Sequence, residues 1–141
     1  MKQVLSFLTM GVDDLEKMKK FYNEVFGWKP IKDEHGIVFY KLNGFIFALY
    51  PASELAEDAG IPAEGSGFKK FTMAINLRSE AEVDQVFAEA ENKGAKAIKR
   101  PEKVFWGGYR GYIADIENNY WEFAFNPFLE LDSEGNVITH Q

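Results

Sequence analysis

Glu122 is the residue whose surroundings point most directly to chemistry. It lies at the centre of the run Tyr120-Trp121-Glu122-Phe123-Ala124-Phe125. Because successive side chains of a β-strand point to opposite faces, Glu122 shares one face with Tyr120 and Ala124, and the other face is aromatic. A carboxylate in so apolar a strand costs free energy unless it meets water, a cation or a ligand. We therefore expect the face of Glu122 to border a cavity or a charged partner.

A β-hairpin is predicted to position this carboxylate. The two apolar runs 109–114 and 120–125 are joined by a polar turn that contains Asn118 and Asn119. Asparagine tolerates left-handed backbone angles, which tight turns require. The two runs therefore form neighbouring antiparallel strands.

The register of the hairpin decides which side chains meet Glu122. We expect Ala114 to lie opposite Tyr120. Tyr112 then faces Glu122, and Arg110 lies diagonal to it, about 7–8 Å away between backbones and within reach of a long side chain. Glu122 is then either a structural carboxylate, held by Arg110 or by the Tyr112 hydroxyl, or a proton acceptor or anchor for a polar ligand group.

The chain repeats one order of elements twice. Asp13 caps a first predicted helix that stops at Gly27, and Ser79 caps a second that stops at Gly94. The two caps are 66 positions apart and the two stops 67. We interpret this as a duplicated module of strand, helix and three strands. The predicted strands cover residues 4–12, 28–31, 37–42, 45–50, 70–77, 95–99, 109–114 and 120–125.

Two stretches fall outside the modules, which cover residues 1–50 and 69–128. Residues 51–68 mix Pro and Gly with Ala, Ser and acidic residues, and this composition predicts a linker or lid loop. Residues 129–141 predict a polar C-terminal tail. We expect the two modules to form a single domain over residues 1–128, a size that buries about two-thirds of its unfolded surface.

Composition excludes several classes of function. The 141 residues carry a net charge of -6, so generic attraction to nucleic acid or to an anionic membrane is not expected. No run approaches the roughly 18 apolar residues of a membrane span, and the apolar N-terminal stretch is too short for a signal peptide. We therefore expect a cytoplasmic protein. Because the chain has no cysteine, disulfides, thiolate catalysis and Cys-ligated metals are excluded.

The hairpin that carries Glu122 and the start of the first predicted helix together resemble a known family. The pattern Gly-Gly-Tyr-x-Gly-Tyr-x-Ala-Asp over residues 107–115, followed by Asn119-x-Trp121-Glu122 and then Asn-Pro, is similar to the vicinal oxygen chelate superfamily, which includes glyoxalase I, bleomycin-resistance proteins and extradiol dioxygenases. The run Met-Gly-Val-Asp-Asp-Leu over 10–15 supports this resemblance, which covers about residues 3–127. It implies an α+β fold in which two βαβββ modules form a U-shaped, mostly antiparallel sheet around a small-molecule cavity, often in a homodimer.

The resemblance also implies where the metal ligands of catalytic relatives would fall. These positions are Phe7, Ala48, Thr72 and Glu122. Only Glu122 carries a usual metal-binding group, whereas a divalent ion needs three or four converging donors. The two histidines, His35 and His140, are not at metal-ligand spacing with one another. We therefore expect no metal and no cofactor.

The alternation of the strands predicts the wall of the cavity. The wall residues share the face of Glu122 and include Phe7, Thr9, Ala48, Tyr50, Thr72, Arg110 and Tyr112. Such a lining, mostly apolar with a few polar groups, suits a neutral, partly aromatic small molecule. Trp106 either closes over this ligand by stacking or pins its own connection to the sheet.

Three functional hypotheses follow. The first is a metal-free glyoxalase/bleomycin resistance-like protein that binds a small, partly aromatic molecule as a homodimer. The second is a lyase, isomerase or dioxygenase of the same superfamily that uses Glu122 as a base or as one metal ligand. The third is an interaction module whose cavity is vestigial. The positions of Phe7 and Ala48 count against metal catalysis, but nothing in the sequence separates a binder from a metal-free enzyme.

Overall fold

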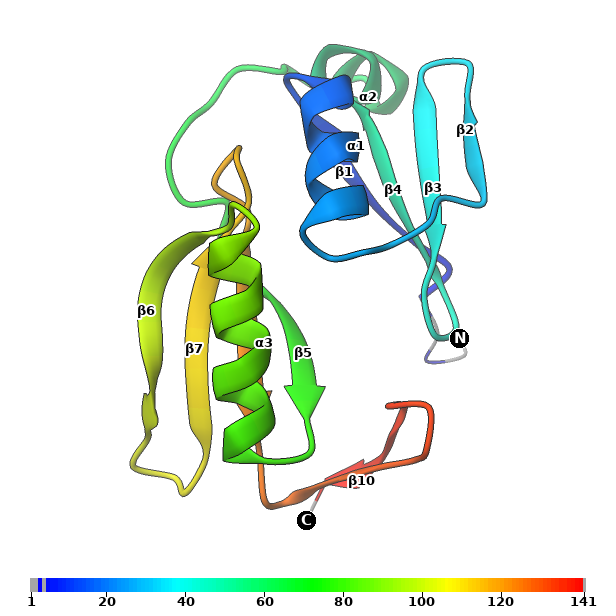
Figure 1. The fold of residues 1–141 in the computed structure, drawn as a ribbon. Helices are drawn as coiled ribbons and strands as arrows, with labels where there is room; N and C mark the ends of the chain where they lie inside the picture. Colours follow the sequence, from blue (N-terminus) through cyan, green and yellow to red (C-terminus); the bar gives the residue numbers. More distant parts are fainter. Residues whose placement is uncertain (1–2, 4, 141) are drawn as a thin grey trace. The chain divides into compact units, whose positions relative to one another are not determined.

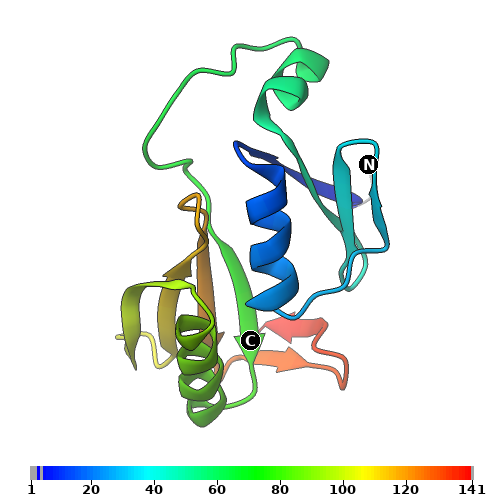
Figure 2. The same ribbon diagram turned by 45° about the horizontal axis from the view of Figure 1, so that its top comes forward.

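The computed structural model describes residues 3 and 5–140 of the chain and divides into two compact units, Met1–Gly67 and Phe68–Gln141. Each unit carries a four-stranded mixed sheet with a helix on one face (Figures 1 and 2). The division falls at the end of the predicted connection 51–68. The fold is α+β, as the sequence predicted. That the two modules form a single domain over residues 1–128 stays a prediction.

Unit 1 places its first strand beside its last. The sheet order is β1-β4-β3-β2, with β1 parallel to β4 and the other pairs antiparallel. Its elements are β1 (Phe7–Val12), α1 (Leu15–Glu24), β2 (Lys32–Glu34), β3 (Ile37–Lys41), β4 (Ile46–Pro51) and α2 (Ala52–Ala59). The predicted strand 4–12 is thus shorter in the structure, and Val4 lies outside the described residues.

The N-cap of helix α1 lies one residue later than predicted. The side chain of Asp14, not Asp13, accepts a hydrogen bond from the backbone N–H of Lys17 at 3.0 Å. The helix buries Met18, Phe21 and Tyr22. Helical spacing places these side chains on one face, so their burial attaches α1 to the sheet.

The core of unit 1 is an aromatic cluster around Tyr22. Its ring centroid lies 5.1 Å from that of Phe47 and 5.8 Å from that of Trp28. Tyr40 is also buried, and its hydroxyl donates to Oδ1 of Asn23 at 2.8 Å. The prediction of a strand over 28–31 was wrong because Trp28 turns into this cluster, and the next strand begins at Lys32.

The predicted loop 51–68 contains helix α2. Between Pro51 and Gly60 the sequence is rich in Ala, Leu and Glu, which are strong helix formers. The helix packs on β1 and β4, and Gly11 permits this approach because a Cβ at Gly11 would lie 3.1 Å from the Ala52 Cα. Gly60 ends the helix with a left-handed φ of 69°. Only the remainder of the stretch, after Gly60, has no helix or strand.

Unit 2 repeats the topology of unit 1, which confirms the predicted duplication of elements. Its sheet order is β5-β8-β7-β6, and again the first strand pairs in parallel with the last. Its sheet and main helix are built from β5 (Met73–Leu77), α3 (Glu80–Asn92), β6 (Lys96–Lys103), β7 (Tyr109–Ala114) and β8 (Tyr120–Phe125).

Helix α3 covers one face of the unit 2 sheet. Ser79 caps it as predicted, because its hydroxyl accepts from the backbone N–H of Glu82 at 3.1 Å. Val83, Phe87 and Ala90 are buried against the sheet. The helix lies so close to β7 that a Cβ at Gly111 would be 3.0 Å from the Phe87 ring. We call the sheet face that α3 leaves uncovered the open face.

Strand β6 is longer than predicted. The sequence indicated a strand over 95–99 and a connection over 101–108, whereas β6 continues to Lys103 with irregular register around Pro101. Proline interrupts central strands because it has no N–H to donate. Strand β6 is an edge strand, so this missing donor is tolerated there.

The predicted polar tail folds into a second hairpin. It consists of β9 (Leu129–Leu131) and β10 (Val137–His140), which pair antiparallel. The side chain of Asp132 closes the turn by accepting from the backbone N–H groups of Glu134 and Asn136 at 2.9 and 2.8 Å. The turn that the sequence indicated is therefore present, but it joins two strands.

Candidate functional site

The β7–β8 hairpin has the predicted register. Ala114 lies opposite Tyr120 and Tyr112 lies opposite Glu122. The buried Asp115 organises the turn, since its Oδ1 accepts from the backbone N–H of Asn119 at 2.9 Å. The hairpin thus holds Tyr112 and Glu122 side by side on the open face.

The half-buried pair Tyr112 and Glu122 is the centre of this candidate site. The Tyr112 hydroxyl donates a hydrogen bond to Oε2 of Glu122 at 2.9 Å. Burial, and then this hydrogen bond to the carboxylate, raises the pKa of Tyr112 above its usual value of 10.0. The phenol therefore keeps its proton at neutral pH and acts as a donor. The sequence offered Arg110 or Tyr112 as the structural partner of Glu122, and the structure shows Tyr112.

Arg110 is paired with Glu102 and not with Glu122. Its Nη1 lies 3.3 Å from Oε1 of Glu102, and its guanidinium carbon lies 5.8 Å from the ring centroid of Tyr112. Lys99 contacts the same carboxylate at 3.4 Å. The hydrogen bond from Arg110, followed by that from Lys99, lowers the pKa of Glu102. Glu102 was not predicted as a site residue, because the predicted strand ended at residue 99. The available signal was the mixture of acidic and basic side chains between residues 99 and 103.

Strand β5 supplies the other side of the open face. Its parallel register places Ala74 beside Glu122 and Asn76 beside Ala124. Thr72, a predicted ligand-binding residue, is exposed and precedes the first residue of β5. Thr72 therefore lies just before β5, and Asn76 lies within β5.

The predicted site residues of unit 1 share one face of their own sheet. The parallel register pairs Phe7 with Ile46 and Thr9 with Ala48, and Tyr50 follows Ala48 on the same side of β4. The Phe7 ring meets the Phe39 ring edge-on at 5.5 Å. Burial, and then the charge of Glu54 in α2, raises the pKa of Tyr50. This face is an aromatic surface that also carries the hydroxyls of Thr9 and Tyr50.

Trp106 lies in the turn between β6 and β7. Its indole packs on its own turn so closely that a Cβ at Gly108 would lie 1.9 Å from the ring. The side chain is 38% exposed, and the neighbouring Phe105 is fully exposed. Of the two roles proposed for Trp106, this conformation fits the pinning of the connection.

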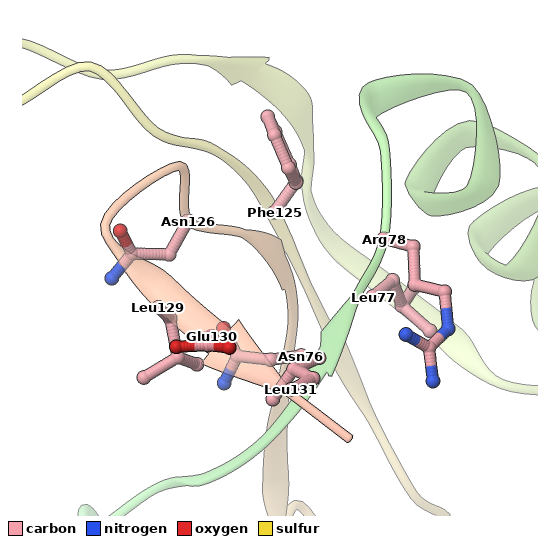
Figure 3. A pocket seen from close by; sticks show the side chains of 8 residues that line it. All are labelled: Asn76, Leu77, Arg78, Phe125, Asn126, Leu129, Glu130 and Leu131. Carbon is pink, nitrogen blue, oxygen red and sulfur yellow. The ribbon is translucent and has the colours of Figure 1, made fainter. Parts of the chain in front are cut away.

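A separate pocket of about 240 Å³ lies at the carboxyl ends of β5 and β8 (Figure 3). Residues 76–78 form one side, Phe125 and Asn126 form a second, and β9 closes the third. This pocket was not predicted, because residues 129–141 were expected to form a polar tail. The apolar residues Leu129 and Leu131, spaced by two, were the available signal.

Comparison with known proteins identifies the family. The model of the glyoxalase/bleomycin resistance protein/dioxygenase superfamily matches residues 4–123, and the chain belongs to this superfamily. A glyoxalase-related enzyme from Fulvimarina pelagi is 34% identical, with a TM-score of 0.89 over 99% of this chain and 100% of that one. A comparison with proteins of curated function gave no match.

Two more distant structures share the fold. A family enzyme from Burkholderia phytofirmans PsJN is 23% identical, with a TM-score of 0.77 over 86% of this chain and 98% of that one. Lactoylglutathione lyase from Agrobacterium tumefaciens is 22% identical, with a TM-score of 0.70 over 89% and 96%. At this level of identity the likeness concerns the fold alone.

The residues at the family's metal positions do not fit a metal ion. Phe7 and Ala48 carry no donor atoms, and Ala48 is buried. Thr72 lies outside its strand, and Glu122 is engaged by Tyr112. Within the described part of either unit, no three His, Asp or Glu side chains gather as an ion would require. The absence of a metal from the working protein stays a prediction.

None of the helices in the described part of the chain is long and apolar enough to cross a lipid bilayer. Its longest helix, α3, covers 13 residues and carries five acidic side chains.

Proposed function

We propose that the protein binds a small, partly aromatic molecule on the open face of unit 2 without a metal, and that Glu122 anchors a hydroxyl group of that molecule. The observation that carries this proposal is the hydrogen bond from Tyr112 to Glu122 at 2.9 Å. It engages Oε2 and leaves the lone pairs of Oε1 for a donor on the ligand.

The charges of the open face favour a neutral ligand. The guanidinium of Arg110 is already matched by Glu102, and Glu122 presents a carboxylate. An anionic ligand would meet the Glu122 charge, whereas a neutral alcohol or phenol can donate to it. The Tyr112 ring beside this carboxylate offers an apolar surface on which an aromatic body can stack.

Native mass spectrometry beside the denatured mass is the first experiment, with a mild chelator to remove adventitious ions. It also tests the predicted homodimer. We expect a metal-free dimer, with or without an additional organic mass. A stoichiometric divalent ion that resists the chelator would overturn the metal-free proposal.

Binding is then measured by two-dimensional NMR with phenol as the neutral probe and benzoate as the anionic one. We expect saturable shifts around residues 112 and 122 with phenol, and at least tenfold weaker binding of benzoate. In Glu122→Gln, phenol affinity should stay within about tenfold, or 1.4 kcal/mol, because the amide oxygen still accepts. Tighter binding of benzoate than of phenol would contradict the proposed ligand class.

A second candidate function is a metal-free enzyme in which Glu122 is a general base. The same pair favours this function, because Glu122 can accept a proton from a substrate while the neighbouring Tyr112 phenol keeps its own proton. Acetophenone in D₂O tests it, since a base exchanges the methyl protons next to the carbonyl. Exchange that is catalysed by the protein and lost in Glu122→Gln, with binding intact, would favour the enzyme over the binder.

A further inference from the structure

We propose that the pocket beside the C-terminal hairpin is a second binding site, and that its ligand is a small zwitterion, an α-amino acid with an apolar side chain. The pocket is formed entirely by unit 2 (Figure 3). Five of its eight lining residues follow residue 123, where the family match ends. The site is therefore built largely by a segment that the family match does not include.

The wall of the pocket is held by hydrogen bonds. Nη2 of Arg78 donates to the backbone carbonyls of Asp132 and Ser133 at 2.6 and 3.1 Å, which fixes the hairpin to the end of β5. Oδ1 of Asn126 accepts from the backbone N–H of Phe128 at 2.9 Å, and this fixes the entry to β9. A preorganised wall reduces the entropy that a ligand must pay on binding.

Two side chains of opposite charge, Glu130 and Arg78, line the pocket. Figure 3 shows Glu130 and Arg78 on opposite sides of Asn76. Among the described residues, the Glu130 carboxylate has no hydrogen-bond or ion-pair partner. The two carbonyls occupy only one nitrogen of Arg78, so its Nη1 and Nε donors are available. A carboxylate and a guanidinium at one pocket match an ammonium and a carboxylate on one ligand.

The remaining lining of the pocket is one amide and four apolar side chains. The side-chain amide of Asn76 can accept from an ammonium group, and it has no partner within the described chain. The apolar lining is made by Leu77, Phe125, Leu129 and Leu131. A volume of about 240 Å³ is below the roughly 300–1,000 Å³ of pockets for drug-sized ligands. The pocket therefore suits a molecule the size of a single amino acid.

L-leucine is the probe for the test, and two of its analogues separate the charges. Isopentylamine keeps the ammonium and the apolar body, and 4-methylpentanoate keeps the carboxylate and the apolar body. We expect saturable NMR shifts at residues 76–78 and 129–131 with leucine, and at least fivefold weaker binding of each analogue. If leucine gives no saturable shift up to 20 mM, or if either analogue binds as tightly, the proposal is wrong.

Glu130→Gln tests the ammonium contact directly, and Glu134→Gln is the matched control. Both glutamates are exposed and belong to the same hairpin, but only Glu130 lines the pocket. Leucine binding should weaken at least tenfold in Glu130→Gln and stay within twofold in Glu134→Gln. Equal affinities in the two variants would overturn the assignment of Glu130. Because phenol binding at Glu122 is measured separately, failure at one site is distinguishable from failure at the other.

Discussion

The hydroxyl of Tyr112 and the carboxylate of Glu122 are joined by a hydrogen bond of 2.9 Å between directly paired residues of β7 and β8. The strands themselves hold the phenol against the carboxylate, so no loop has to close for the pair to form. The Tyr112 donor and the Glu122 acceptor are therefore already positioned by two paired strands. This arrangement costs little reorganisation when a ligand arrives.

Tyr112→Phe removes the donor and leaves a half-buried carboxylate with one hydrogen bond fewer. We expect the free energy of unfolding in urea to fall by about 1–2 kcal/mol, the usual cost of losing a hydrogen bond to a charged group. Phenol affinity should fall at least threefold, because the orientation of Glu122 is no longer fixed.

Tyr109→Phe is the control for this variant. It also loses a hydrogen bond from a phenol to a carboxylate, because the Tyr109 hydroxyl donates to Oδ1 of Asp84 at 2.6 Å. That pair lies beside α3, away from the open face. Phenol affinity should stay within twofold, and an equal loss in both variants would argue against a site at Tyr112.

Acidification should weaken the contact between Arg110 and Glu102. The pKa of Glu102 is lowered from 4.5, first by the Arg110 hydrogen bond and then by Lys99. A lowered pKa in the folded state means that the contribution to stability is present above pH 4.5 and is lost as the pH falls through the folded pKa. Urea unfolding of Glu102→Gln and of the original protein should therefore differ above pH 4.5 and converge in more acidic solution.

Carboxyl ¹³C NMR gives a direct check of the same contact. The pKa of Glu102 should rise in Arg110→Gln and rise less in Lys99→Gln, since Arg110 is the larger cause. If neither substitution moves the pKa, the two cations do not hold this carboxylate in solution.

The sequence predicted the hairpin around Glu122 because its signals are local. Alternation of side chains and a turn rich in Asp and Asn determine the register over a few residues, and Asp115 and Asn119 supply the hydrogen bonds that such a turn needs. The sequence left Arg110 and Tyr112 open as partners of Glu122, and it did not indicate Glu102 as the partner of Arg110, because that contact depends on a third strand. That strand contains Pro101, which argued for a connection.

The secondary structure of the two segments outside the modules, residues 51–68 and 129–141, was also not predicted. Residues 52–59 are mostly good helix formers. The Pro and Gly residues of the stretch, among them Pro51 and Gly60, nevertheless indicated a loop. Leu129 and Leu131 are too few to mark a strand by periodicity alone. Both elements depend on contacts that only the fold shows: α2 packs on β1 and β4, and the hairpin of β9 is held by the hydrogen bonds from Arg78 to the carbonyls of Asp132 and Ser133.

Gly111 is required by the packing of α3 on β7. An alanine Cβ would lie 2.9 Å from the Lys99 carbonyl oxygen and 3.0 Å from the Phe87 ring, and the carbonyl cannot move without its strand. We expect Gly111→Ala to reduce the free energy of unfolding by about 1–3 kcal/mol, as overpacking does. Gly11→Ala, whose nearest contacts are 3.1–3.3 Å, should cost less. A smaller effect at Gly111 than at Gly11 would contradict this packing.

Helix α2 can be tested through the residue that caps its C-terminus. Gly60 has a φ of 69°, and a Cβ there would meet no atom within 4 Å, so Gly60→Ala strains only the backbone. We expect a cost of about 1 kcal/mol, because L-residues disfavour this conformation. Amide hydrogen exchange should then become faster in residues 52–59 and at Ile61, whose N–H donates to the Ala56 carbonyl, and stay unchanged in 62–68, which form no helix. Equally fast exchange across 52–68 in the original protein would instead show that this stretch is a loop in solution, as its composition first indicated.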